Sequence, residues 1–138
     1  MKEKLKLAYM DVARTFSNCS TAKRLKVGAI LVKNGNIISF SYNGTPSGFD
    51  NDCEDIINGE LVTKSIVLHA EENLLMKIAK SNESSEDSVM FVTHSPCIKC
   101  ARLIYQAGIK EVYYRNEYRI KDGLIFLEKC GIRIEKIN

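Results

Sequence analysis

Apolar residues recur along the chain with two periods, and these periods predict its helices and strands. Residues 2–17 place Leu5, Tyr9, Val12 and Phe16 at helical spacing between charged side chains, which predicts an amphipathic helix. Strands are predicted where Val, Ile and aromatic residues gather or alternate, and further helices where apolar positions return every three or four residues. The predicted strands are 27–33, 37–42, 89–93, 109–114 and 132–137, and the predicted helices are 69–80, 97–107 and 120–130.

Turn residues separate these segments. Asn34-Gly35 lies between the first two strands and favours a hairpin, because both central positions of that turn need a positive φ. Gly108 and Gly131 follow two of the helices and are typical of helix ends. Residues 43–64 are rich in Gly, Pro, Asp and Asn, so we expect a long loop with a short helical turn near 53–58. A loop of this length inside a compact domain is more often functional than idle.

The order of the elements indicates the fold class. After the first helix the predicted order is β-β-α-β-α-β-α-β, which implies a mixed sheet covered by helices on both faces. We therefore expect an α/β protein, a three-layer α-β-α sandwich around a mixed five-stranded sheet. The chain contains no internal repeat and no linker-like stretch, so residues 1–138 are expected to form one domain.

Composition narrows the class of protein. Hydrophobic residues make up 45% and charged residues 27%, the balance of a globular chain and not of a disordered one. The net charge of +3 is too mild to indicate a nucleic-acid partner. No apolar run is long enough to span a membrane and the first residues lack a signal-peptide core, so we expect a cytoplasmic protein without a membrane partner. In that reducing compartment we expect cysteine pairs to serve as metal ligands or catalytic groups rather than to form disulfides; the chain has five cysteines.

Two short motifs carry the candidate chemistry, His69-Ala70-Glu71 and Pro96-Cys97-Ile98-Lys99-Cys100. One imidazole and two thiols would leave the fourth position of a tetrahedral zinc ion open, as in catalytic zinc sites. Ser95-Pro96 is a helix-start signal, since serine can cap a helix and proline suits the first helical position. The two cysteines then share one helix face near its N-terminus, which lowers a thiol pKa and favours the thiolate.

The two motifs are expected to meet in space. The 28 positions from His69 to Cys97 suit a helix, a loop and a strand that return the chain to the same edge of the sheet. The Cys-x-x-Cys pair alone is equally typical of a redox pair or half of a structural zinc site, and a lone histidine is more often a packed residue. The combination and its order predict one catalytic zinc.

The pattern H-x-E followed by P-C-x-x-C is similar to the signature of zinc-dependent nucleobase deaminases. In that chemistry zinc lowers the pKa of a water to about 7, and the hydroxide attacks C4 of cytosine. Glu71, which is not a ligand, would take the proton and pass it to N3 and then to the leaving amine. The alternative for Glu71 is an acidic residue favoured only by the helix dipole.

From about Ser20 onward the chain resembles the deoxycytidylate (dCMP) deaminases of the cytidine deaminase superfamily. The resemblance implies hydrolysis of dCMP to dUMP and ammonia, which supplies dUMP for thymidylate synthesis. It implies zinc ligands at His69, Cys97 and Cys100 and a proton shuttle at Glu71. The motifs that carry it are Ser20-Thr21-x-x-Arg24-x-x-Val27-Gly28-Ala29, Tyr42-Asn43-Gly44-Thr45-Pro46-Ser47-Gly48, His69-Ala70-Glu71-x-Asn73, Thr93-His94-Ser95-Pro96-Cys97-x-x-Cys100, Ala107-Gly108-Ile109-Lys110, Tyr118-Arg119 and Gly131-Ile132.

The resemblance also implies how the substrate binds. Asn43 would hydrogen-bond the sugar hydroxyl, the backbone amide of Ala70 would hold the pyrimidine, and Tyr118 would contact the substrate. His94 is either a wall of the pocket or a packing residue. For the phosphate, Arg24 and Arg119 stand at family positions among basic candidates that also include Lys23, Lys26 and Arg115.

The loop 44–50 resembles the region where family members bind a regulatory deoxynucleoside triphosphate with Mg²⁺, dCTP activating and dTTP inhibiting. Its glycines would let the backbone approach phosphates, although the loop also reads simply as turn-rich. Family members are commonly homo-oligomers, often hexamers. The residues assigned to this regulatory loop are Gly44, Thr45, Ser47 and Gly48.

The chain departs from the family pattern at two positions. Ser41 replaces a usual glycine, and Ala22 replaces a cysteine that in many members binds a second, structural zinc. Cys19 and Cys53 alone are too few for a closed site, so we expect one zinc per chain.

Two other functions remain open at this point. The chain could deaminate another substrate: a tRNA adenosine, cytidine, or an intermediate of the riboflavin pathway. It could also be a non-catalytic zinc-binding or nucleotide-sensing protein on the same scaffold. The mild charge argues against a tRNA substrate, and the presence of Glu71 argues against a sensor.

Overall fold

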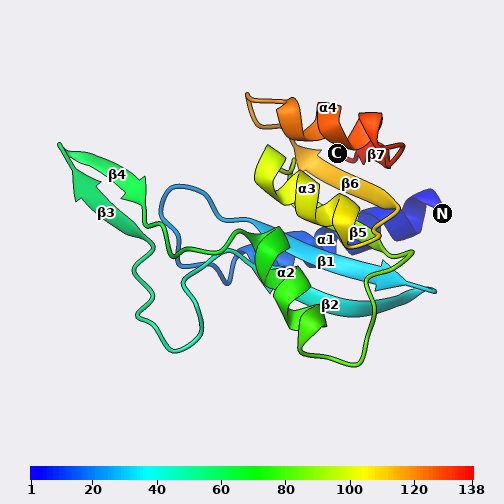
Figure 1. The fold of residues 1–138 in the computed structure, drawn as a ribbon, viewed down its shortest axis with the longest axis horizontal. Coiled ribbons are helices and arrows are strands. Elements are labelled where there is room, and N and C mark those ends of the chain that lie inside the picture. The colour runs from blue at the N-terminus through cyan, green and yellow to red at the C-terminus, as the bar shows by residue number, and fades with distance from the viewer.

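In the computed structural model, which describes residues 1–138, a five-stranded mixed sheet lies between one helix and three others (Figure 1). The strand order is β2-β1-β5-β6-β7. Strand β1 is antiparallel to both of its neighbours, whereas β5, β6 and β7 are parallel. The elements are α1 (Glu3–Ser17), β1 (Gly28–Lys33), β2 (Asn36–Tyr42), β3 (Glu54–Ile57), β4 (Glu60–Thr63), α2 (Ala70–Ala79), β5 (Val89–His94), α3 (Ile98–Gln106), β6 (Glu111–Asn116), α4 (Asp122–Lys129) and β7 (Arg133–Lys136).

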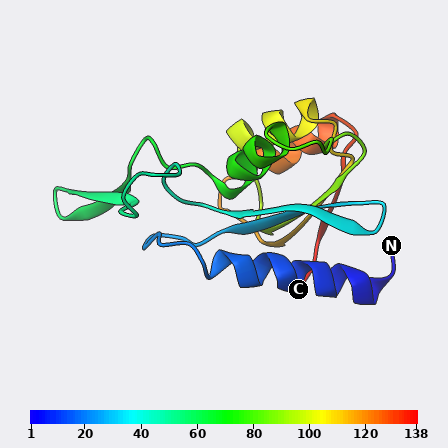
Figure 2. The same ribbon diagram turned by 90° about the horizontal axis from the view of Figure 1, so that it is seen from below.

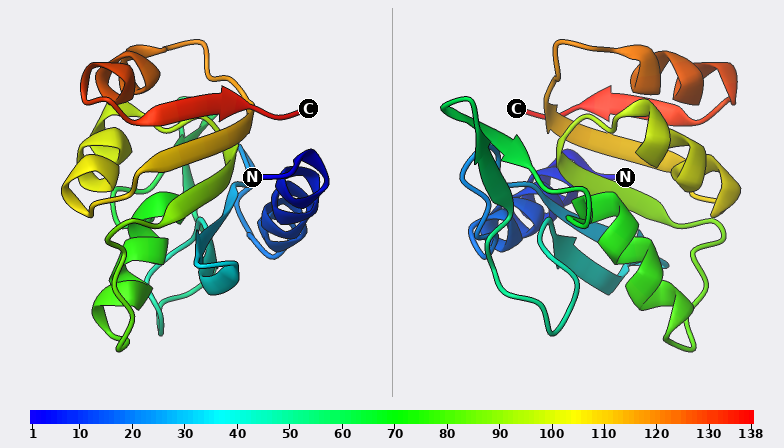
Figure 3. Two further views of the ribbon diagram at one scale, coloured as in Figure 1. Left: turned by 90° about the vertical axis from the view of Figure 1, so that its right-hand side faces the viewer. Right: turned by 60° about the vertical axis from the view of Figure 1, so that its left-hand side comes forward.

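Helices cover both faces of this sheet. Helix α1 lies alone beneath it, and α2, α3 and α4 lie together above it (Figure 2). The left view of Figure 3 shows α1 on one side of the sheet and the other helices on the opposite side. The expected three-layer α-β-α sandwich with a mixed five-stranded sheet is confirmed. None of the helices is both long and apolar enough to cross a membrane.

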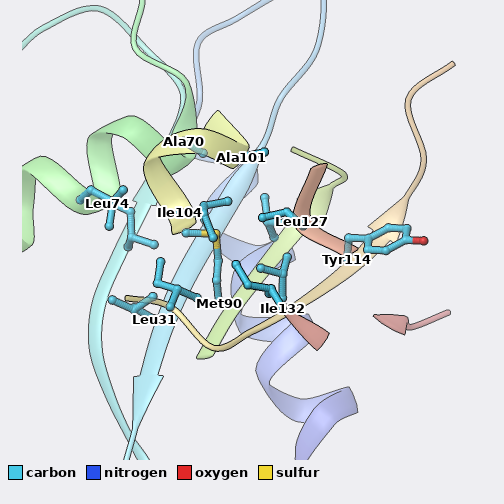
Figure 4. Close-up of a cluster of buried hydrophobic side chains, with 14 of the residues drawn as sticks. Leu31, Ala70, Leu74, Met90, Ala101, Ile104, Tyr114, Leu127 and Ile132 are labelled. Atoms are coloured by element: carbon cyan, nitrogen blue, oxygen red, sulfur yellow. The ribbon is translucent and has the colours of Figure 1, made fainter. Parts of the chain in front are cut away.

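Side chains of the central strands alternate between two cores. On β5, Met90 and Val92 pack under the three helices, whereas Val89 and Phe91 pack against α1. Successive strand residues point to opposite faces, and both faces are covered here, so the central strands are apolar throughout. The larger core gathers around Met90 and Ile104 (Figure 4) and extends to Ala70, the first residue of α2.

The segment 43–64 differs from the long loop with a short helical turn that was predicted for it. Residues 54–63 contain no helical turn and form a separate two-stranded sheet, β3–β4. Its turn, Asn58-Gly59, has φ values of 52° and 79°, close to the 51° and 76° of the predicted turn Asn34-Gly35. The hairpin projects away from the sandwich, at the left of Figure 1, and every residue of β4 is exposed. Neither face is buried, so its residues lack the apolar alternation that marks a strand.

The carboxyl end of β5 leads directly to the start of α3. Cys97 is the N-cap residue of that helix, so Ser95 does not cap it and Pro96 does not occupy its first turn. The Oγ of Ser95 instead accepts a hydrogen bond from the backbone N–H of Tyr118 at 2.9 Å, and the chain stays extended through Cys97. His69 is likewise the N-cap residue of α2. Both predicted motifs therefore stand where helices begin, beside the carboxyl end of β5, as in many open α/β sheets.

Candidate active site

His69, Cys97 and Cys100 lie close together, although the first two are 28 positions apart in the chain. The Nδ1 atom of His69 lies 3.6 Å from Cys97 Sγ and 3.3 Å from Cys100 Sγ. The ligand atoms of the three residues all lie within 4.8 Å of one another, and no other group of His, Cys, Asp and Glu side chains in the chain has this geometry. The predicted convergence of two helix starts is confirmed.

This donor set fits zinc. Tetrahedral bonds of about 2.3 Å to sulfur and about 2.0 Å to nitrogen place donor atoms roughly 3.5–3.8 Å apart. The two measured distances from His69 are close to those values. Three protein ligands leave a fourth position for water or substrate, as in catalytic rather than structural zinc sites.

Hydrogen bonding within the triad shifts the pKa values of its members. A hydrogen bond from the Cys100 thiol, aided by His69, lowers the pKa of Cys97 to about 3, so Cys97 is a thiolate at neutral pH. The bond to Cys97 raises the pKa of His69 to about 9. The pKa of Cys100 is raised by the same thiol contact and by burial. Metal uptake must therefore displace protons from Cys100 and His69, which makes it favoured at higher pH.

Glu71 is the buried carboxyl group beside these ligands. It belongs to the first turn of α2 and is only 4% exposed. Burial raises its pKa to about 7. A carboxyl group with a pKa near the working pH can both accept and return a proton, which is the property of a general acid–base. A residue that only complements the helix dipole would be solvated, whereas Glu71 is buried, so its environment favours the catalytic role.

A pocket of about 630 Å³ opens over the site, a size suited to a nucleotide. Its lining contains every residue predicted to bind substrate, namely Arg24, Asn43, Ala70, Tyr118 and Arg119. His69, Glu71 and Cys97 also line it, whereas Cys100 lies behind them, fully buried. Lys23, Lys26 and Arg115, the other basic candidates, do not line this pocket, which leaves Arg24 and Arg119 as its two cationic side chains.

Asn43 contributes to the pocket wall and also fixes the chain opposite it. Its Oδ1 accepts the N–H of Val27 at 2.9 Å and its Nδ2 donates to the carbonyl of Leu25 at 2.8 Å. One N–H and one lone pair of the amide remain for a ligand. Ala70 is the first residue of α2, so its own N–H has no acceptor within the helix. Ser41 Oγ donates to the carbonyl of Ala70 at 2.5 Å and ties β2 to this helix start.

Tyr118 lies in the segment between β6 and α4, held by the Ser95 hydrogen bond described above. Its ring lies beside that of His94, with centroids 5.6 Å apart. Burial raises the pKa of the Tyr118 hydroxyl, so this group is a neutral donor at physiological pH. His94 itself does not line the pocket, and its ring packs beside that of Tyr118.

The hairpin supplies pocket residues that were not predicted from the sequence. Glu54 at the start of β3 and Thr63 at the end of β4 both line the pocket. The Asn58-Gly59 turn was the signal that could have revealed the hairpin. No local pattern could have shown that its base faces the metal ligands.

Helix α4 packs closely on the start of α3. A Cβ atom at Gly123 would lie 2.1 Å from the carbonyl oxygen of Pro96 and 2.9 Å from the carbonyl carbon of Cys97. The absence of a side chain at Gly123 thus lets α4 approach the peptide that carries a zinc ligand.

The predicted regulatory residues lie outside the pocket. None of Gly44, Thr45, Ser47 and Gly48 is among its lining residues. Gly44 forms an isolated bridge with Leu68, and the Oγ1 of Thr45 donates to the carbonyl of Asp50 at 2.6 Å. Their regulatory role stays a prediction.

Comparison with known proteins places this geometry in context. Residues 3–116 match the family model described as the cytidine and deoxycytidylate deaminase zinc-binding region. The crystal structure of dCMP deaminase from the cyanophage S-TIM5, in complex with dCMP and dUMP, is 53% identical and superposes with a TM-score of 0.93, over 99% of each chain.

Curated relatives are more distant. Deoxycytidylate deaminase of Enterobacteria phage T4 is 35% identical over 83% of this chain and 76% of its own length. ComE operon protein 2 of Bacillus subtilis is 34% identical over 86% of this chain and 63% of its own. The chain spans between 42% and 63% of the lengths of the first three curated relatives that it matches.

Proposed function

The chain belongs to the family of cytidine and deoxycytidylate deaminases, and from this premise we propose that it hydrolyses dCMP to dUMP and ammonia with one zinc ion per chain. The observation that carries the proposal is a nucleotide-sized pocket in which a His/Cys/Cys triad adjoins a buried glutamate. The dCMP and dUMP bound by the cyanophage enzyme support this choice of substrate.

In this mechanism His69, Cys97 and Cys100 would hold the zinc. When bound, zinc supplies a water whose pKa is lowered to about 7. Glu71 accepts the proton of the attacking water and delivers it to N3 of the cytosine as C4 is attacked. Glu71, again a carboxylate, then takes the proton of the new C4 hydroxyl and passes it to the amine, which leaves as ammonia while the C4 carbonyl of dUMP forms. Burial of Glu71 keeps bulk water from competing for this proton.

The pocket walls orient the nucleotide. The N–H of Ala70 is available to the pyrimidine, and the remaining N–H of Asn43 is available to the sugar hydroxyl. Tyr118 closes the pocket over the substrate. Arg24 and Arg119 bind the 5′-phosphate, since guanidinium groups match phosphate oxygens with paired donors.

The test is a deamination panel at neutral pH. Ammonia release is followed with dCMP, CMP, deoxycytidine, dCTP and tRNA as separate substrates. We expect dCMP to give the highest kcat/KM. A higher value for any other member of the panel contradicts the proposed substrate, and no release from any of them favours the non-catalytic alternative.

We further propose that residues 44–48 bind a regulatory deoxynucleoside triphosphate with Mg²⁺, with dCTP activating and dTTP inhibiting, in a homo-hexamer. The positive φ of Gly48, 91°, and the exposure of Ser47 and Gly48 are compatible with backbone contacts to phosphates. Rates of dCMP turnover that do not change with either triphosphate would remove this regulation, and sedimentation would test the hexamer. The five unpaired thiols are consistent with a reaction in the reducing cytoplasm.

A further inference from the structure

Two residues at the base of the β3–β4 hairpin contact Arg24, one at its backbone amide and the other at its guanidinium group. Glu54 and Thr63 are paired across the two strands, where the hairpin joins the rest of the chain. One carboxylate oxygen of Glu54, Oε2, accepts the backbone N–H of Lys23 at 2.9 Å and that of Arg24 at 3.1 Å. At the other end of the same residue, Nη1 of Arg24 donates to Oγ1 of Thr63 at 3.0 Å.

These contacts fix a part of the chain that secondary structure does not. Residues 18–27 belong to no helix or strand, so the backbone amides of Lys23 and Arg24 lack partners from a helix or a ladder. Glu54 supplies those partners although it is only 5% exposed and its second oxygen, Oε1, has no hydrogen-bond partner. Burying a carboxylate with one unsatisfied oxygen is costly, which indicates that the position serves more than the stability of the hairpin.

These contacts restrict the side chain of Arg24 before any ligand binds. An arginine side chain loses about 2 kcal/mol of rotamer freedom when it is immobilised, so an arginine already held in place binds its ligand more tightly. The contact with Thr63 uses one of five N–H donors and leaves the others for a phosphate. The two N–H bonds on Glu54 also offset its negative charge, which would otherwise oppose an anion in the same pocket.

We propose that Glu54 and Thr63 are positioning residues that hold Arg24 in place for the 5′-phosphate of the substrate. The inference rests on the proposed function, because it assigns the phosphate of dCMP to Arg24. It predicts that the hairpin determines the preference for a nucleotide over its nucleoside. Neither side chain takes part in proton transfer, so their loss should leave the turnover of a phosphate-free substrate unchanged.

The experiment compares dCMP with deoxycytidine on the zinc-loaded enzyme. In Glu54→Ala and Thr63→Val we expect kcat/KM for dCMP to fall about tenfold, mainly through KM, because a hydrogen bond to a charged group is weakened or lost. With deoxycytidine both variants should match the wild type. Glu54→Gln and Thr63→Ser keep the acceptor oxygens and should restore dCMP turnover to within about twofold. Glu60→Gln removes a charge from the same hairpin away from Arg24 and serves as the control.

The outcomes separate this inference from the function on which it rests. If the wild type shows no preference for dCMP over deoxycytidine, the proposed function fails. If the wild type prefers dCMP and the variants keep that preference, or lose both substrates equally, the positioning role is overturned. Thr63 is exposed, so Thr63→Val is expected to fold. It therefore tests the positioning role even if Glu54→Ala does not fold.

Discussion

Replacing Gly123 by alanine tests how tightly α4 fixes the start of the cysteine helix. The new Cβ would lie 2.1 Å from the Pro96 carbonyl oxygen, so the two must move apart by about 0.9 Å before the contact reaches even 3.0 Å. The atoms that must move belong to the peptides on both sides of Cys97. They are backbone atoms, which yield less readily than the end of a flexible side chain.

Two opposing terms set the magnitude for stability. Alanine favours a helix over glycine by about 1 kcal/mol, whereas overpacking costs about 1–3 kcal/mol. We therefore expect Gly123→Ala to lower the free energy of unfolding by about 1 kcal/mol, measured in urea. The larger effect falls on function, because a ligand displaced by about 1 Å costs on the order of 100-fold in turnover. Zinc retention against a competing chelator should fall as well.

Gly131→Ala is the matched control. Gly131 follows α4 with a φ of 79°, and a Cβ there would meet nothing within 4 Å. Alanine in this conformation costs about 1 kcal/mol, so the control loses similar stability without touching the site. It should keep full zinc content and turnover. If Gly123→Ala behaves like the wild type in turnover and zinc retention, the close approach does not position Cys97 and the reasoning is refuted.

Three further changes have defined outcomes. Glu71→Gln should retain zinc yet lose at least about 100-fold in turnover, and full activity with zinc bound would contradict its role as proton shuttle. In zinc-free protein, folding raises the pKa of Glu71 from 4.5 to about 7, so the stability that its proton contributes is present below pH 4.5 and is lost as the pH rises to 7. At pH 8, zinc-free Glu71→Gln should therefore unfold at a higher urea concentration than zinc-free wild type, and equal midpoints would argue against a raised pKa for Glu71. Dialysis against a chelator should abolish dCMP turnover and zinc should restore it, with metal analysis near one per chain; a value near two would contradict the interpretation of Ala22. Ser41→Ala removes the hydrogen bond to the carbonyl of Ala70 and should cost about 1 kcal/mol in thermal or urea unfolding, whereas no loss would show that the bond is replaced by water.

The sandwich and the metal triad were predictable because their signals are local. Strands such as β1 and β5 are apolar on both faces, and each helix shows an apolar stripe that ends at a glycine or a polar loop. The triad followed from two short motifs placed at helix starts, with enough chain between them to return to the same sheet edge. A connection of this length, made of one helix, one loop and one strand, has few ways to bring the two motifs together other than at one edge of the sheet.

The hairpin and the cap of α3 could not be predicted in the same way. Strands β3 and β4 pair with nothing else and bury almost nothing, so no hydrophobic period distinguishes them from a loop. Ser95 has the residue type of a helix cap, but its hydroxyl oxygen instead accepts a hydrogen bond from the backbone N–H of Tyr118, 23 positions away. Such partners arise from the tertiary fold, which overrides local preference.

The exposed hairpin also provides a practical site for labelling. Its tip, Asn58-Gly59, has open space around the glycine, and only the opposite end contacts the pocket. Extra residues inserted at such a tip add only closure entropy, roughly 0.6 kcal/mol for each doubling of loop length. A fluorophore carried there would stand roughly 13 Å from Thr63 along a four-residue strand, close enough to report nucleotide binding without obstructing it.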